Sequence, residues 1–270
     1  MLKISVITIV YNNQANIAGC IQSVLNQSYQ NIEHIVIDGG STDGTQAAIE
    51  PFKDKLGYYL SEKDKGLYNA LNKGIRAATG DIIGILHSDD FYYDNDTLKA
   101  VADCFEQTKA DLVYANGQYV LQSTNYKQQT TDYKIKRIYR AHPFRKCYLN
   151  LGWIPLHTTI YVRKEVFENY GLYDESYSIA SDYEISQRWF REDKIKKAFL
   201  NRWVVKMRLG GKSTNPALQK KKSAEDMRVI RAYKMWGYFT LACKIGQKIP
   251  QYLLPQLTFY RRKTFKRHRP

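Results

Sequence analysis

Two adjacent carboxylates, Asp89 and Asp90, are the residues of this chain best suited to hold a cation. They follow the apolar segment Ile82–Leu86, whose length and composition are typical of a strand buried on both faces of a parallel sheet. Two adjacent carboxylates repel each other unless a cation lies between them. Because open α/β sheets bind ligands at the carboxyl edge of their strands, the pair predicts a metal-assisted site there. The alternative is that the pair caps the helix beginning near Asp96 or closes a turn.

Polar side chains also follow the other predicted strands of the first half. Thr8 and Tyr11 lie at the end of the first strand, Asp38 ends the second, and the charged loop 62–66 follows the third. A carboxylate at Asp38 could accept hydrogen bonds from a base N–H or a ribose hydroxyl, as acidic residues do in nucleotide-binding βαβ units. The loop 39–45 holds three glycines but has neither GK[ST] nor GxGxxG, so the sequence disfavours an ATPase or a nicotinamide enzyme.

The elements that position these residues alternate between strands and helices. Strands are predicted at 4–10, 32–37, 56–60, 82–86 and 112–115, with helical spacing of apolar residues between them. This order predicts an α/β fold, a mostly parallel sheet with right-handed crossovers and helices on its faces. Further strands are predicted at 158–162 and 204–209, and helices at 164–169 and 181–191. Residues 123–155 are polar, basic and rich in tyrosine, and they show no assignable pattern.

Charge divides the 270-residue chain into two parts. The net charge is +15, and residues 215–270 hold 14 Lys and Arg against only Glu225 and Asp226, so the body is nearly neutral and the tail strongly basic. That asymmetry indicates that the tail binds a polyanionic surface, either a membrane or a nucleic acid. The four cysteines are far apart without a CxxC spacing, which predicts neither zinc nor disulfides and fits a reducing cytoplasm. With no apolar run of 18 residues and no signal peptide, we expect a cytoplasmic protein that does not span a bilayer.

Four stretches of the sequence, in this order, resemble the family-2 glycosyltransferases with the GT-A fold. They are ISVITIVYNN at 4–13, IDGGSTDGT at 37–45, SEKDKGLYNALNKGIRAATGDIIGILHSDD at 61–90 and IASDYEISQRW at 179–189. The resemblance covers residues 3–214 and is closest to the bacterial branch that builds capsule, exopolysaccharide and lipopolysaccharide. It implies a Rossmann-like GT-A catalytic domain over 1–214, with a nucleotide-sugar-binding half, 1–115, and an acceptor half, 116–214.

The resemblance implies an inverting transfer from a nucleotide sugar, with a UDP-sugar as the expected donor and Mn²⁺ or Mg²⁺ as the cofactor. The corresponding donor residues are Thr8, Tyr11 and Asp38 in the nucleoside pocket with Asp64 near it, Asp89 facing the ribose, and Asp90 on the metal. A divalent ion on the phosphates neutralises the charge that develops as the C1–O bond breaks. Carboxylate oxygens are the hard ligands that these ions prefer.

Asp182 matches the family's catalytic base, which takes the proton of the acceptor hydroxyl. The family usually has an acidic pair at this point, whereas Ser181 precedes Asp182 here, and this difference leaves Glu184 as a rival base. Glu184 and Arg188 are spaced i, i+4 and could equally form an ordinary surface ion pair. A saccharide, with its hydroxyl as the nucleophile, is the expected acceptor.

Four other residues stand out, and three of them have two interpretations each. His87 stands where this branch commonly has Asn, which could alter donor contacts. His157 could contact acceptor or phosphate, or could be structural. Lys212, in the loop 210–214, is predicted either to meet the diphosphate as part of a lid or to belong to an ordinary turn. Trp153 could belong to a sugar platform or to the core.

Two other classes of function compete with a glycosyltransferase. A sugar-nucleotide pyrophosphorylase would need a glycine- and base-rich phosphate loop directly after the first strand, where this chain has Tyr11-Asn12-Asn13. A nucleic-acid-binding protein would explain the basic tail, but carboxylates clustered at the sheet edge would repel phosphate, so no nucleic acid is expected. Only the glycosyltransferase accounts for all four stretches.

The tail, residues 215–270, mixes aromatic and basic side chains in the way an interfacial membrane helix requires. We expect it to dock the enzyme on the inner face of the cell membrane, on anionic lipid, where a lipid-linked saccharide acceptor would lie. The alternative is that the helix at 227–245 packs on the catalytic body or on a second subunit, so a homo-oligomer is compatible with the sequence.

Overall fold

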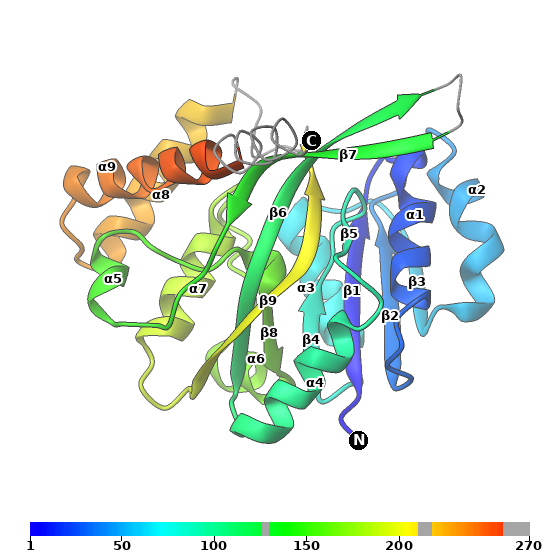
Figure 1. The fold of residues 1–270 in the computed structure, drawn as a ribbon, viewed down its shortest axis with the longest axis horizontal. Helices are drawn as coiled ribbons and strands as arrows, with labels where there is room; N and C mark the ends of the chain where they lie inside the picture. The colour runs from blue at the N-terminus through cyan, green and yellow to red at the C-terminus, as the bar shows by residue number, and fades with distance from the viewer. Residues whose placement is uncertain (126–129, 210–217, 256–270) are drawn as a thin grey trace, which may run out of the picture.

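The computed structural model describes residues 1–125, 130–209 and 218–255, and these form one nine-stranded sheet with helices around it (Figure 1). The first half contains β1 (Ile4–Val10), α1 (Gln14–Leu25), β2 (Ile32–Asp38), α2 (Thr45–Ile49), the 3₁₀ helix η1 (Glu50–Lys55), β3 (Tyr58–Ser61), α3 (Leu67–Ala77), β4 (Ile82–Ile85), β5 (Phe91–Tyr92) and α4 (Thr97–Thr108). The second half contains β6 (Leu112–Asn125), β7 (Thr130–Tyr139), α5 (Cys147–Asn150), η2 (His157–Thr159), β8 (Ile160–Arg163), α6 (Lys164–Tyr170), α7 (Ser181–Arg191), β9 (Lys197–Arg208), α8 (Gln219–Ala232) and α9 (Tyr238–Gly246).

The strands lie in the order β3-β2-β1-β4-β8-β6-β9-β5, and β7 pairs with β6. β1 is parallel to both β2 and β4, and β2 is parallel to β3. β8 enters antiparallel between β4 and β6, which joins the two halves in one sheet. The predicted α/β class is therefore confirmed, and the carboxyl ends of β1 to β4 meet at one edge, at the top of Figure 1.

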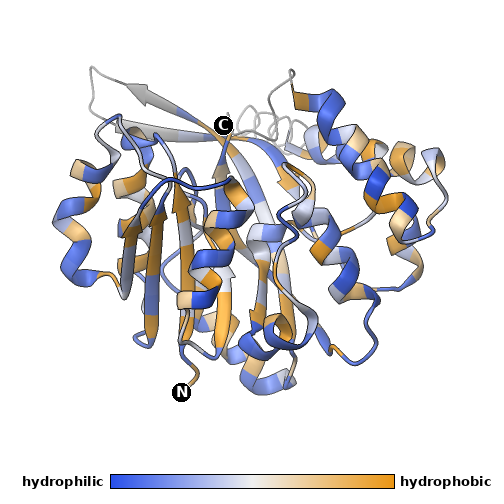
Figure 2. Ribbon diagram, turned by 180° about the vertical axis from the view of Figure 1, so that it is seen from behind, coloured by the Kyte–Doolittle hydropathy of each residue, from blue (hydrophilic) through white to orange (hydrophobic). Residues whose placement is uncertain are grey.

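The core occupies both faces of the sheet. Alternate residues of β1 belong to different hydrophobic clusters, with Ile7 in the cluster of α3 and α7 and Val6 in the cluster of α1 and α4. Figure 2 shows the central strands as predominantly apolar. Gly74 lets α3 pack tightly on β1, since a Cβ there would lie 2.5 Å from Ile7 Cγ2. This close packing positions the charged loop before α3 at the ligand-binding edge.

A long hairpin, β6 with β7, is the largest feature that the sequence pattern did not predict. The two strands pair antiparallel from Gly117 opposite Tyr139 outward, and Figure 1 shows the hairpin projecting beyond the body. Leu121 and Ile135 in it are 43% and 39% exposed. The inner part of β6, where a strand was predicted at 112–115, is buried, but the described residues of the outer part, 121–122 and 133–135, are exposed on both faces. That outer part therefore lacks the alternation of apolar and polar residues that identifies a strand in a sequence.

The described tail contains one helix that belongs to the core and one that is largely exposed. On α8, Met227, Val229 and Ile230 are buried in the same hydrophobic cluster as α7. On α9, Tyr238 and Phe239 are 74% and 59% exposed. None of the helices within the described ranges is both long and apolar enough to cross a membrane.

Candidate active site

Asp90 is a buried carboxylate with one unsatisfied oxygen. It follows β4, is 1% exposed, and its Oδ1 accepts a hydrogen bond from the Arg208 backbone N–H at 3.2 Å. Its Oδ2 is also buried but has no hydrogen-bond partner among the described residues. The Arg208 guanidinium donates to the backbone carbonyl of Asp89 at 2.6 Å, so Arg208 holds this turn against the end of β9.

The surroundings of Asp90 fit a bound cation. Burial, followed by the charge of Asp89, raises the pKa of Asp90 well above its usual range. A carboxylate in this condition is stabilised in its ionised form when a cation fills its open coordination position. The described part of the chain contains no group of three or more potential metal-ligating side chains. One carboxylate is nevertheless enough for Mg²⁺ or Mn²⁺ when phosphate oxygens and water supply the remaining ligands.

Tyr11, Gly39 and Asp64 gather at the ends of β1 to β3. Tyr11 is 61% exposed, so its ring is available to a ligand. A Cβ on Gly39 would lie 3.0 Å from Asp64 Oδ2 and 3.4 Å from Tyr11 Cδ2, so glycine makes room for both side chains. Lys73 on α3 forms ion pairs with Asp64 and with Glu62, which anchor the loop 62–66.

Asp38 and Thr8, predicted in the nucleoside pocket, both lie beneath the surface. The Asp38 carboxylate is fully buried and accepts hydrogen bonds of 2.5 Å from the hydroxyls of Ser41 and Ser61. Thr8 is also fully buried, and its hydroxyl lies 2.9 Å from His34 Nε2. In this structure Asp38 ties two edge loops together, and direct contact of either residue with a nucleoside stays a prediction.

Asp182 lies in the first turn of α7, where its carboxylate is held at both oxygens. Oδ1 accepts the Tyr183 backbone N–H at 2.8 Å and lies 3.5 Å from the Tyr68 hydroxyl. Oδ2 lies 3.5 Å from Nδ1 of His157, which is part of η2. The Asp182 side chain remains 29% exposed, so an acceptor hydroxyl can reach it.

A pair of histidines connects the turn that carries Asp90 with Asp182. His87 Nε2 lies 2.7 Å from His157 Nε2, and the His87 carbonyl accepts the backbone N–H of Asp90. Burial lowers the pKa of both histidines, that of His87 to about 3, so both rings are neutral at pH 7. With Nδ1–H of His157 facing the carboxylate, its Nε2 must accept a hydrogen bond from Nε2–H of His87. His87, His157 and Asp182 thus form one directed chain.

The charge of Asp182 is set by opposing effects. Burial alone would raise its pKa, but His157 and the ammonium groups of Lys222 and Lys244 outweigh burial and lower it. Because His157 is itself neutral near pH 7, it acts through its N–H dipole, and the two lysines supply the full positive charge. Asp182 is therefore an ionised carboxylate at neutral pH, ready to accept a proton.

Both carboxylate oxygens of Glu184, the rival base, already have partners. One of its oxygens pairs with the Arg188 guanidinium, and the other accepts the Tyr233 hydroxyl at 2.8 Å. The ion pair expected from the i, i+4 spacing is present, partly buried rather than on the surface.

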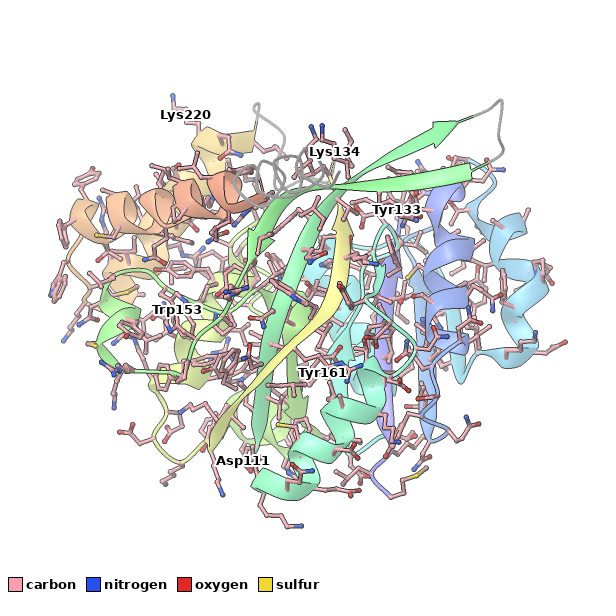
Figure 3. The ribbon with its side chains drawn as sticks, in the orientation of Figure 1. Asp111, Tyr133, Lys134, Trp153, Tyr161 and Lys220 are labelled. Carbon is pink, nitrogen blue, oxygen red and sulfur yellow. The ribbon has the colours of Figure 1, made fainter. Side chains whose placement is uncertain are left out.

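Trp153 is 7% exposed and packs among Tyr114 and Phe190, so it belongs to the core (Figure 3). Lys212 lies outside the described residues.

Two residues of this site went unrecognised in the sequence. Arg208 is the next-to-last residue of the strand predicted at 204–209, just before the loop containing Lys212, a position that could have drawn attention. Glu225 belongs to the tail, yet its carboxylate accepts the backbone N–H groups of Ser178, Ile179 and Ala180 at 2.8 to 3.1 Å, just before α7. No local pattern links Glu225 to a segment more than forty residues earlier.

Known proteins with related sequences are glycosyltransferases. Glycosyl transferase family 2 matches residues 5–171. A PGL/p-HBAD biosynthesis glycosyltransferase of Mycobacterium tuberculosis is 29% identical over 220 residues, which cover 80% of each chain. An uncharacterized glycosyltransferase of Rickettsia prowazekii is 28% identical over 235 residues, covering 83% of this chain and 70% of that protein.

Solved structures share the fold at low sequence identity. Residues 1–349 of S. aureus TarS, in complex with UDP, superpose with a TM-score of 0.61 at 20% identity, over 85% of this chain and 64% of that one. Mannosyltransferase PcManGT from Pyrobaculum calidifontis, in complex with GDP-Man and Mn²⁺, gives 0.61 at 17% identity, over 86% and 64%. This chain thus spans less than two thirds of both structures. Since the family match covers more than half of its residues, the chain belongs to glycosyl transferase family 2.

Proposed function

We propose that this glycosyltransferase moves a sugar from a nucleoside diphosphate donor, a UDP-sugar, to a saccharide hydroxyl with inversion. The proposal rests on one observation: Asp90 and Asp182 are connected through the contact between His87 and His157. Asp90 has a buried oxygen open to a cation, and Asp182 is ionised and accessible. These are the two groups that a direct displacement at the anomeric carbon requires.

The roles follow from the chemistry of each side chain. Asp90 would hold Mn²⁺ or Mg²⁺, which neutralises the leaving diphosphate, and Asp89 would contact the donor ribose. Tyr11 and Asp64 would border the base, above the loops that Asp38 ties together. Asp182 would take the proton of the acceptor hydroxyl as that oxygen attacks the face opposite the leaving group. The nucleotide and metal named for the TarS and PcManGT complexes support this class of donor and cofactor.

The proposed acceptor is a lipid-linked saccharide in bacterial surface polysaccharide synthesis, reached from the inner face of the membrane. Exposed apolar and aromatic side chains on α9 and the residues after it support this part of the proposal. Exposed Arg231 and Lys234 adjoin them, giving the mixture of apolar surface and positive charge that an anionic lipid surface attracts.

The test of the donor site is UDP binding with and without Mn²⁺, after a screen of nucleotide sugars. Asp90→Ala should abolish the metal-dependent part of UDP binding and donor turnover, because it removes the only side chain proposed to hold the ion. Asp103→Ala, the same substitution at an exposed position of α4, is the matched control and should bind like the parent. Parental UDP–Mn²⁺ binding in Asp90→Ala would show that the metal is held elsewhere.

A further inference from the structure

Three charged side chains of the C-terminal helices lie close together beside α7 with little exposure. Lys222 and Asp226 are on α8, and Lys244 is on α9. The ammonium nitrogens of Lys222 and Lys244 lie 3.3 and 2.7 Å from the Asp226 carboxylate, and the three side chains are 16%, 12% and 7% exposed, respectively. The single carboxylate of Asp226 is therefore the counter-ion of two ammonium groups.

Two further cations extend this group. Lys248 is half-buried, and its pKa is lowered first by burial and then by the positive charges of Lys222 and Arg137. The Arg137 guanidinium lies 4.5 Å from the ring centre of Tyr119, and its Nε–H donates to the neutral amide of Gln251 at 2.7 Å. Among the ion pairs of the described residues, none includes Lys248 or Arg137.

The four cations border the Asp182 side of the site. The Lys244 ammonium lies 3.2 Å from the ring centre of Tyr183, the residue that follows Asp182. Lys248 comes four residues after Lys244 in the sequence, and Arg137 contacts Gln251, three residues further on. In agreement with this placement, Lys222 and Lys244 lower the pKa of Asp182. The negative charges of Asp90 and Asp182 both raise the pKa of Tyr119, the residue whose ring Arg137 covers. The group is therefore next to the proposed base, where an acceptor hydroxyl would sit.

Positive charge exceeds negative charge in this region. Four cations face only two carboxylates, Asp226 and Asp182, and half-buried cations without counter-ions are destabilised by desolvation and mutual repulsion. A bound anion removes that repulsion. We propose that Arg137, Lys222, Lys244 and Lys248 form a binding site for a phosphate group carried by the acceptor. The proposal rests on the function proposed above, because it takes Asp182 as the base.

A phosphate group suits these cations better than a single carboxylate does. It carries up to two negative charges and three acceptor oxygens, enough for several ammonium groups and a bidentate guanidinium. Lys244 is on α9, which exposes aromatic side chains, and Lys248 follows it, so the phosphate would lie close to a membrane plane. A lipid-linked glycosyl diphosphate and a water-soluble glycosyl phosphate share this chemistry.

Phosphate binding can be measured by calorimetry on the full chain saturated with UDP and Mg²⁺, so that the donor's own diphosphate site is already filled. The parent should bind inorganic phosphate, and Lys248→Gln and Arg137→Gln should each weaken that binding about tenfold. Lys220→Gln is the matched control, since Lys220 is on α8 with Lys222 but is exposed at the outer edge of the molecule (Figure 3). UDP affinity should be unchanged in all three variants.

Transfer assays then compare three acceptors with the same sugar: polyprenyl diphosphate-linked, phosphorylated but water-soluble, and unphosphorylated. The phosphorylated acceptors should have the lower KM, and Lys248→Gln should raise that KM about tenfold with kcat within about twofold. A lower KM only for the polyprenyl acceptor would show that the site binds the phosphate of a lipid-linked acceptor. An equally low KM for both phosphorylated acceptors would show that the phosphate group alone is recognised.

Three results would overturn the phosphate site: no phosphate binding by the UDP-saturated parent, displacement of phosphate by UDP, or an equal loss in Lys220→Gln. Failure of the parent to bind UDP with Mg²⁺ in the same titrations would instead count against the proposed function. The two failures are therefore distinguishable.

Discussion

The chemistry at the residue scale depends on how three side chains share their protons. Asp182 accepts one backbone N–H and faces one imidazole, and the second imidazole fixes the tautomer of the first. Buried neutral histidines cost little desolvation, whereas an isolated buried carboxylate would be protonated. The arrangement keeps Asp182 ionised and leaves its side chain partly exposed.

Replacing the proposed base tests this directly. Asp182→Asn preserves the shape and removes the proton acceptor, so transfer should fall by roughly two to four orders of magnitude while UDP affinity persists. Glu184→Gln is the comparison, because its amide oxygen can still accept the Tyr233 hydroxyl, and it should retain most of the transfer rate. The base would have to be reassigned to Glu184 if the two variants gave the opposite order in steady-state assays.

The histidine pair gives a second prediction. His157→Ala should lower kcat roughly ten- to a hundredfold with little change in donor KM, since it removes the group that orients Asp182. His87→Gln can still donate to His157, because its amide nitrogen takes the place of Nε2, and it should stay within about threefold of the parent. His87→Leu cannot donate and should resemble His157→Ala. Equal rates in His87→Gln and His87→Leu would show that the hydrogen bond to His157 is irrelevant.

At the scale of elements, α8 holds the start of α7 in place. The Glu225 carboxylate accepts the last three backbone N–H groups before α7, one turn ahead of Asp182. Burial alone would raise the pKa of Glu225, but the three N–H groups outweigh burial and lower it. A lowered pKa means that this contact adds stability above the ordinary pKa of a glutamate and loses it as the pH falls through the lowered value.

Glu225→Gln should therefore lower kcat severalfold without changing UDP affinity, because it loosens the segment that carries Asp182. It should also lower the melting temperature by a few degrees at pH 7, and the difference from the parent should shrink as the buffer is acidified below about pH 4. Glu168→Gln, at an exposed position of α6, is the matched control. A variant with parental kcat and a lowered melting temperature would limit Glu225 to a structural role.

How much could be predicted from the sequence differs between elements for a physical reason. β1 and β4 are buried on both faces, so continuous apolar runs identify them, and the turn carrying Asp89 and Asp90 follows from the end of β4. β7, the outer part of β6 and the first half of β9 are partly exposed and leave no such pattern. The contacts of Glu225 and of His87 with His157 join distant segments and depend on packing alone.

On the scale of the whole molecule, the donor edge, Asp182 and the C-terminal helices all lie toward one end. Figure 1 shows α8 and α9 at the same end as the carboxyl edge of the parallel strands. The tail therefore combines two functions in one place: α8 completes the core around α7, and the segment after it exposes apolar side chains beside the site.

The exposed surface of the tail is a stripe along one helical face. Trp236 and Phe239 lie with ring centres 5.9 Å apart, and Ile245, Ile249 and Leu253 follow at intervals of four residues, each at least 50% exposed. Four-residue spacing places these three side chains on one side of the helical segment. An apolar stripe of this kind, beside exposed lysine and arginine, is stabilised by contact with a lipid surface and costs free energy in water.

The last prediction is that this stripe binds anionic membranes. The full chain should float with vesicles containing phosphatidylglycerol at low salt and should lose much of that binding in 0.5 M salt, as the cationic contribution of about 1 kcal/mol per charge is screened. Serine at Trp236, Phe239 and Ile249 together should abolish flotation while leaving UDP binding intact, because these side chains lie outside the core. Tyr58→Ser, at an exposed tyrosine on β3, is the control and should float normally. If the triple variant floated as well as the parent, or if the parent did not float at low salt, the stripe would not bind lipid. It would then be assigned to contact with a protein partner or a second copy of the chain.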